Sequence, residues 1–130
     1  MTFEEVLETV RHEGAYASRL QAEEVVRTVL AAFGRQLPEE VRTELTILLP
    51  HEASEALASG PPSDQHLTAY AFVVDLASRT NGTSATARWN AGTVLRVVSH
   101  MAGEQLTRRI IGQLPSGYAL LFGRAELITA

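Results

Sequence analysis

The chain has 130 residues, of which 45% are hydrophobic and 20% charged, and its formal net charge is −4 at pH 7. This composition fits one ordinary globular domain and excludes a disordered chain, and the negative charge disfavours a nucleic-acid binder. The absence of cysteine excludes disulfides, thiolate nucleophiles and cysteine-based zinc sites. There is no apolar run of about 18 residues, and the start MTFEEVLETV is acidic, so we expect a cytoplasmic protein with no transmembrane helix and no secretion signal.

The charge is divided unevenly along the chain. Residues 1–65 carry five arginines and twelve acidic residues, a net charge of −7, whereas residues 66–130 carry six arginines and three acidic residues, a net charge of +3. Such a division permits attraction between the halves, or head-to-tail pairing of two chains. No lysine occurs, which a GC-rich genome explains; an arginine surface for phosphate or carboxylate would require the arginines to cluster.

Each periodic stretch of the first half predicts a helix. Apolar residues at i, i+3, i+4 and i+7 predict a helix over residues 3–13 that ends before Gly14. Ser18 is the expected N-cap of a second helix, and Pro38 and Pro50 are expected as the first residues of two shorter ones. The residues expected on the buried faces of these four helices are Phe3, Val6, Leu7 and Val10; Ala22, Val25, Val26, Val29, Leu30 and Phe33; Val41, Leu45 and Leu48; and Ala53, Ala56 and Leu57.

The pattern restarts after SGPPSD at residues 59–64, where glycine and two prolines cannot continue a helix. In the next helix a stripe of Tyr70, Val73, Val74 and Ala77 repeats the first stripe at an offset of 67. Asn81-Gly82 ends this helix, and Thr83 or Ser84 caps the following one. Further on, TVL at 28–30 matches 93–95, Glu39 matches Glu104, and Leu-Pro at 49–50 matches 114–115, all at an offset of 65.

These matches predict an all-α fold built from two tandem four-helix repeats packed into one globular helical domain, residues 1–130. The repeats cover residues 1–60 and 66–130 and are joined by a Gly/Pro-rich linker, residues 59–65. Each repeat is too small to bury its apolar stripes alone. Because a residue before proline avoids the α region, we expect Leu49 and Leu114 to be extended and to enter the core at the helix corners.

Three stretches of the chain, FEEVLETVRHEG, AEEVVRTVLAAFGRQLPEE and ELTILLPHEASEAL, with their weaker echoes in the second half, resemble a bacterial family of uncharacterised proteins, domain-of-unknown-function family 2267. The resemblance covers nearly the whole chain. It implies an all-α, internally duplicated helical fold and brings no catalytic residues with it.

No motif indicates catalysis or a cofactor. The four histidines, at positions 12, 51, 66 and 100, lack the HExxH spacing of a zinc helix, and GxSxG and phosphate-binding loops are absent. We therefore expect no enzyme, no metal and no cofactor. Arg88, Arg96, Arg108 and Arg109 are few beside the many acidic residues, which makes a DNA-binding helix-turn-helix a weak alternative.

The apolar segment after the second Leu-Pro step is the first candidate for function. Tyr118, Leu121 and Phe122 form the expected inward stripe, which leaves Leu120, Leu127 and Ile128 as surplus apolar residues. The segment either closes the gap between the repeats or forms an exposed docking or dimer surface. Trp89 is likewise either core filler or an interface anchor. The candidate interaction surface consists of Trp89, Tyr118, Leu120, Leu127 and Ile128.

The function expected first is a non-enzymatic protein-interaction or self-association module, which docks by a helix face to an unknown protein partner or as a homodimer. A small-molecule-binding protein with a pocket between the repeats is the second alternative, and a nucleic-acid-binding module is the third. No membrane partner is expected.

Overall fold

The computed structural model describes residues 1–124, and in this range the chain forms helices and no strand, as the all-α prediction requires. None of these helices is long and apolar enough to cross a membrane. The eight helices are α1 (Phe3–Glu13), α2 (Arg19–Gln36), α3 (Glu39–Leu48), α4 (His51–Leu57), α5 (Ala69–Thr80), α6 (Ser84–Ala102), α7 (Glu104–Gly112) and α8 (Tyr118–Leu121).

Side-chain caps set four of the eight helix starts in residues 1–124. Thr2 and Glu5 form a reciprocal capping box at α1, and the Ser18 hydroxyl accepts the backbone N–H of Gln21 at α2, as predicted. Thr83, rather than Ser84, caps α6. Pro38 and Pro50 are the N-caps of α3 and α4, so each helix begins one residue later than expected.

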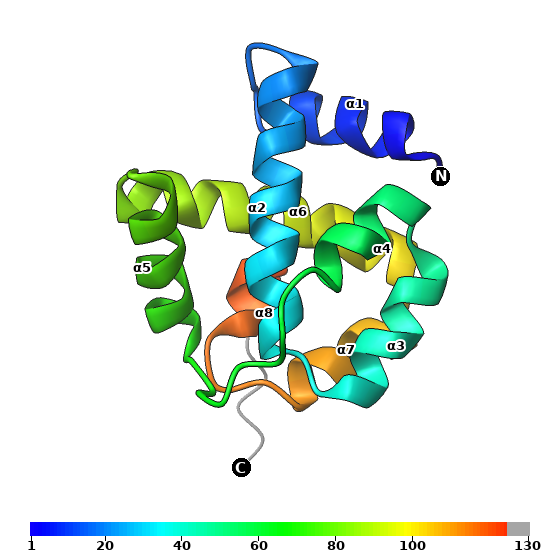
Figure 1. Ribbon diagram of the computed structural model, residues 1–130, viewed down its shortest axis with the longest axis vertical. Helices are drawn as coiled ribbons and strands as arrows, with labels where there is room; N and C mark the ends of the chain where they lie inside the picture. Colours follow the sequence, from blue (N-terminus) through cyan, green and yellow to red (C-terminus); the bar gives the residue numbers. More distant parts are fainter. Residues whose placement is uncertain (125–130) are drawn as a thin grey trace.

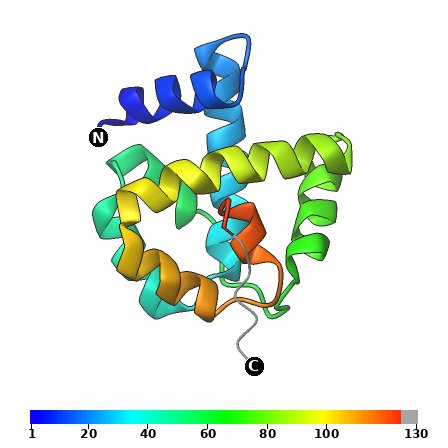
Figure 2. The same ribbon diagram turned by 180° about the vertical axis from the view of Figure 1, so that it is seen from behind.

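The two longest helices, α2 and α6, cross near the middle of the molecule and pack against each other (Figures 1 and 2). Helix α1 lies across one end of α2, while α5 stands on one side and α3, α4 and α7 on the other. The short α8 packs on α6 in the angle between the long helices.

An aromatic cluster lies at the centre of the core. The cluster consists of Phe33 of α2, Phe72 of α5, Tyr118 of α8, and Phe122, which directly follows α8. Each of these side chains is at most 3% exposed, and the centroids of their contacting rings lie 5.8–6.4 Å apart. Such edge and tilted contacts are favoured by the ring quadrupoles. The segments before and after the linker therefore share one core. The internal duplication itself stays a prediction.

Half of the stripe predicted for α5 is wrong, since Val73 and Ala77 are buried as expected but Tyr70 and Val74 are not. Tyr70 is 80% exposed and Val74 is 42% exposed, whereas Phe72 and Leu76 are buried with Ala69, Val73 and Ala77. Helix α5 is apolar on most of its sides, so two overlapping stripes satisfy the same spacing. Phe72 occupies the inward position because its ring packs against Phe33 and Tyr118.

The two Leu-Pro corners differ. Leu49 is extended (φ −92°, ψ 154°) and buried, as predicted. Leu48 was expected to be buried, and this was wrong, because Leu48 is 49% exposed and Leu49 enters the core instead. At the second corner α7 ends at Gly112 and Leu114 is only partly buried. Pro115 does not begin α8, because the left-handed Gly117 (φ 99°) intervenes before Tyr118.

Candidate functional site

The predicted interaction surface divides into exposed, buried and undescribed members. Leu120 is 55% exposed and Trp89 is 52% exposed, so both are available at the surface. Tyr118 is 1% exposed, and its inclusion in the surface was wrong because its ring fills the aromatic cluster. Leu127 and Ile128 lie outside the described residues.

Leu120 and Trp89 line one hollow between α6 and α8, of about 320 Å³, which also contains Arg88, Gly92 and Arg96. A second hollow, of about 420 Å³, lies between α5, α6 and α8 and shares Ala85, Arg88, Leu120 and Leu121 with the first. The two hollows therefore form one continuous depression. We call it the apolar groove and define it by Tyr70, Val73, Ala85, Arg88, Trp89, Arg96 and Leu120.

The turn between α1 and α2 fixes the tryptophan at the end of this groove. The indole Nε1 of Trp89 donates to the carbonyl of Gly14 at 3.0 Å, and the Tyr16 hydroxyl donates to Oδ1 of Asn90 at 2.6 Å. Burial raises the pKa of the Tyr16 phenol, so it remains a donor at neutral pH. Trp89 therefore presents half of its ring to solvent from a position held by its own polar atom.

Two arginines of the groove are unpaired within the described part of the chain. Arg88 and Arg96 are exposed, and no hydrogen bond or ion pair joins either of them to another residue of the range 1–124. Helix α6, which carries both, contains no acidic residue. The other nine arginines each bind a carboxylate or a backbone carbonyl: Arg11, Arg19, Arg27, Arg35, Arg42, Arg79, Arg108, Arg109 and Arg124.

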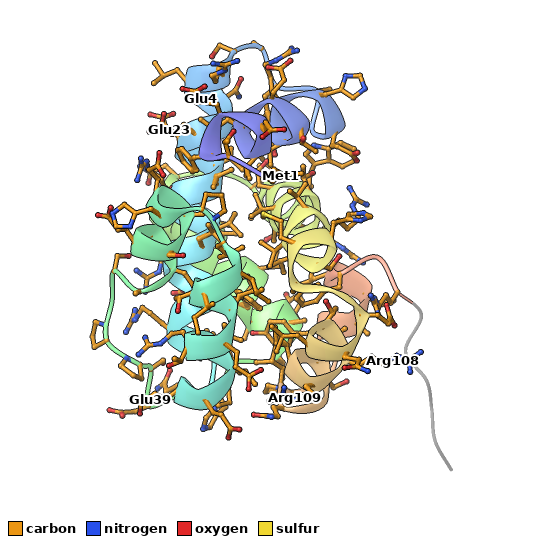
Figure 3. The ribbon with its side chains drawn as sticks, turned by 90° about the vertical axis from the view of Figure 1, so that its right-hand side faces the viewer. Met1, Glu4, Glu23, Glu39, Arg108 and Arg109 are labelled. Atoms are coloured by element: carbon orange, nitrogen blue, oxygen red, sulfur yellow. The ribbon has the colours of Figure 1, made fainter. Side chains whose placement is uncertain are left out.

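The other arginines considered for DNA binding are engaged within the protein. Arg109 of α7 forms a two-pronged pair with Glu44 of α3 at 2.7 and 2.9 Å, and Figure 3 shows it beside that helix. This bond with Arg109 lowers the pKa of the Glu44 carboxyl. Arg108 pairs with Glu104 at 2.8 Å. Of the four arginines, Arg88 and Arg96 are thus the two without a partner in residues 1–124.

No arrangement typical of catalysis is found in residues 1–124. His51 Nε2 lies 2.7 Å from Glu55 Oε1, but both side chains are exposed and no nucleophile is bonded to the pair. The same range holds no group of three His, Asp or Glu side chains that could bind a metal ion. The groove offers apolar surface and cationic donors.

Over its described residues, the chain is a small all-helical protein with an exposed apolar depression edged by two arginines that have no partner there. The family model described as uncharacterized conserved protein (DUF2267) matches residues 3–121. The chain belongs to this family, as the resemblance implied. No curated protein matches the sequence closely enough to count as a relative.

Sequence reasoning missed Tyr70 and the role of Arg88. Tyr70 was assigned to the buried stripe of α5, although the competing stripe with Phe72 and Leu76 would have turned it outward. Arg88 was considered only beside other arginines of the same half. Arg88 and Leu120 line the same hollow only because α8 packs on α6, and no spacing in the sequence indicates this packing.

Proposed function

We propose that this protein is a non-enzymatic self-association module, in which the apolar groove of one molecule takes an apolar, acidic corner of a second copy. The observation that supports this proposal is that Leu120, Trp89 and Tyr70 line one depression with Arg88 and Arg96. Neither arginine has a partner in the range 1–124. Exposed apolar side chains favour burial, and unpaired guanidinium groups favour carboxylates. The fitting occupant is therefore an apolar segment that carries acidic residues.

The corner between α3 and α4 has this chemistry. Ile47 is 76% exposed and Leu48 is 49% exposed, and Glu52 is exposed with no partner in residues 1–124. Helices α3 and α5 lie on opposite sides of the molecule (Figure 1), so this corner cannot reach the groove of its own chain. A contact between the two surfaces requires another copy.

The uneven charge supports pairing between molecules. Within residues 1–124, only the pairs of Arg109 with Glu40 and Glu44 join an arginine of the second half to an acidic residue of the first. Arg79, Arg108 and Arg124 pair with acidic residues of their own half, so little of the attraction between the two halves is used inside one molecule. A corner-to-groove contact uses different surfaces on the two copies, so it is head-to-tail and can continue into rings or short chains.

The proposal is tested by light scattering of the full chain at increasing concentration. We expect a mass above the 14.1 kDa of one chain, and a decrease toward it at high salt because the arginine contacts are screened. Leu120→Asp and Ile47→Asp should each weaken association about tenfold or more, since the new carboxylate would be desolvated without a partner. Leu20→Asp is the matched control, because Leu20 is 72% exposed but belongs to neither surface.

Mixing the two variants tests the head-to-tail geometry. Leu120→Asp keeps its α3–α4 corner and Ile47→Asp keeps its groove, so the mixture should form a one-to-one dimer that grows no further. A wild-type chain that stays monomeric at every concentration contradicts self-association and leaves the groove to a different protein. Association of the variants alone, or failure of the mixture to pair, contradicts the corner-to-groove contact. Circular dichroism must show unchanged helicity in each variant.

A further inference from the structure

A separate cleft of about 860 Å³ lies between α2, α4, the linker and the end of α5, and it shares no residue with the apolar groove. In Figure 1 the linker crosses in front of α2, between α4 and α5. Its cationic lining residues are Arg27 and Arg35 of α2 and Arg79 of α5, and Ala31 and Ala56 give it apolar surface. The volume is in the range of small-molecule sites.

The three arginines share one arrangement. The Nε atom of Arg27 donates to Glu23 at 2.8 Å, that of Arg79 to Asp75 at 2.8 Å, and that of Arg35 to the Pro61 carbonyl at 3.1 Å. No residue of the range 1–124 bonds to their terminal Nη atoms. Each guanidinium is thus held at one edge while its outer N–H donors remain available, which suits two-pronged binding of carboxylate or phosphate.

Arg35 is restrained by the linker. Its Cδ and Cγ atoms lie 3.0 and 3.2 Å from where a β-carbon on Gly60 would stand, so glycine allows the linker to lie directly on the arginine stem. The backbone carbonyl of Arg35 accepts the N–H of Ser63 at 2.8 Å. A side chain fixed before binding loses little conformational entropy when it takes a ligand.

The charge balance defines the ligand further. Glu23 and Asp75 offset Arg27 and Arg79, and Glu55, which also lines the cleft, is paired with His51. Arg35 has no carboxylate partner in the described range, and Glu55 of the same lining carries one opposite charge, so the cleft is close to neutral overall. Recognition therefore depends on directed donors more than on net charge. We infer that this cleft binds a small organic anion that carries two or more phosphate or carboxylate groups, with Arg35 at its centre.

The inference is independent of self-association and is tested on the full chain with two probes, sodium pyrophosphate and sodium citrate, at constant ionic strength set by sodium chloride. Calorimetry should show saturable binding of at least one probe, and the Nε–Hε NMR signals of the cleft arginines should move with it. The tighter probe identifies phosphate or carboxylate as the preferred group. Saturation by neither probe, with signals that follow only the chloride concentration, overturns the inference.

Charge-removing variants locate the site. Arg35→Gln and Arg79→Gln should each reduce the affinity about tenfold or more, which corresponds to one charge-assisted hydrogen bond. Arg88→Gln removes the same charge outside the cleft and should leave the affinity within about twofold. Equal losses in all three variants would mean non-specific attraction and overturn the assignment. Because Arg35 also holds the linker, Arg79→Gln is the decisive variant if Arg35→Gln lowers thermal stability.

Discussion

At the residue scale, one backbone position between the linker and α5 is held from two sides. The N–H of Leu67 donates to Oε1 of Gln36 at 3.0 Å, and its carbonyl accepts the hydroxyl of Tyr118 at 3.1 Å. Gln36 and Tyr118 are both buried, and each thereby satisfies its polar group. The two side chains come from α2 and α8, so Leu67 connects parts of the chain that are far apart in sequence.

Tyr118→Phe should lower the free energy of unfolding by about 1–2 kcal/mol, because the Leu67 carbonyl loses its donor while the ring still fills the core. Tyr70→Phe is the matched control: Tyr70 is 80% exposed and its hydroxyl has no partner in residues 1–124, so no change is expected. Urea unfolding measures both. Equal effects of the two changes would contradict the role given to the Tyr118 hydroxyl.

The same substitution should also change the alkaline side of the stability profile. Burial raises the pKa of the Tyr118 phenol above its ordinary value, so the unfolded chain releases this proton first as the pH rises past about 10. The contribution to stability is present below that pH and is lost above it. If the stability of the wild type falls no more steeply with rising alkaline pH than that of Tyr118→Phe, this assignment is contradicted.

At the scale of elements, a glycine determines how closely α2 and α4 pack. A β-carbon on Gly34 would stand 1.9 Å from the backbone carbonyl oxygen of Leu57, a separation at which the two helices must move apart. Backbone atoms cannot rotate away as the end of a side chain can. The contact also places Arg35, the next residue of α2, beside the linker.

Gly34→Ala should therefore destabilise the protein by about 2 kcal/mol or more, although alanine is the better helix former. Gly112→Ala provides the comparison, since it ends α7 and has no neighbouring atom within 4 Å of the added carbon. We expect Gly112→Ala to be neutral or slightly stabilising. Thermal unfolding measures the stability of both variants. If Gly34→Ala is as stable as the wild type, the two helices can separate at little cost and the prediction is contradicted.

The sequence allowed prediction of elements whose apolar residues form one narrow stripe. In α1 the spacing leaves one possible buried face, and Phe3, Val6, Leu7 and Val10 all lie on it. In α5 two stripes compete, and contact with Phe33 decides between them. That Leu120 lies outside the buried stripe of its helix was predictable from the spacing, as was the buried face of α1. The groove was not predictable, because its residues meet only through the packing of three helices.

At the scale of the whole molecule, each half of the chain supplies side chains that the other half needs to cover its buried groups. The aromatic cluster takes Phe33 from the first half and Phe72, Tyr118 and Phe122 from the second. Trp89 and Asn90 of α6 bond to Gly14 and Tyr16 near the start of the chain. Separation of the halves would expose both sets of groups to water.

Peptides of residues 1–60 and 66–130 should each lack a cooperative unfolding transition, because each would leave one side of the aromatic cluster uncovered. Mixing them should restore helicity measured by circular dichroism, as the missing surfaces are supplied again. Cooperative melting of either peptide alone would show that it has a sufficient core of its own, and the shared core would then be less important than its burial indicates.

The position of the single tryptophan has a practical consequence. Its nitrogen is bonded to Gly14, and half of its ring faces solvent at the end of the apolar groove. The protein thus contains a single tryptophan fluorophore, at a place where water would be displaced by an incoming molecule. Its emission colour responds to that displacement, so occupancy of the groove can be followed optically without a dye or label.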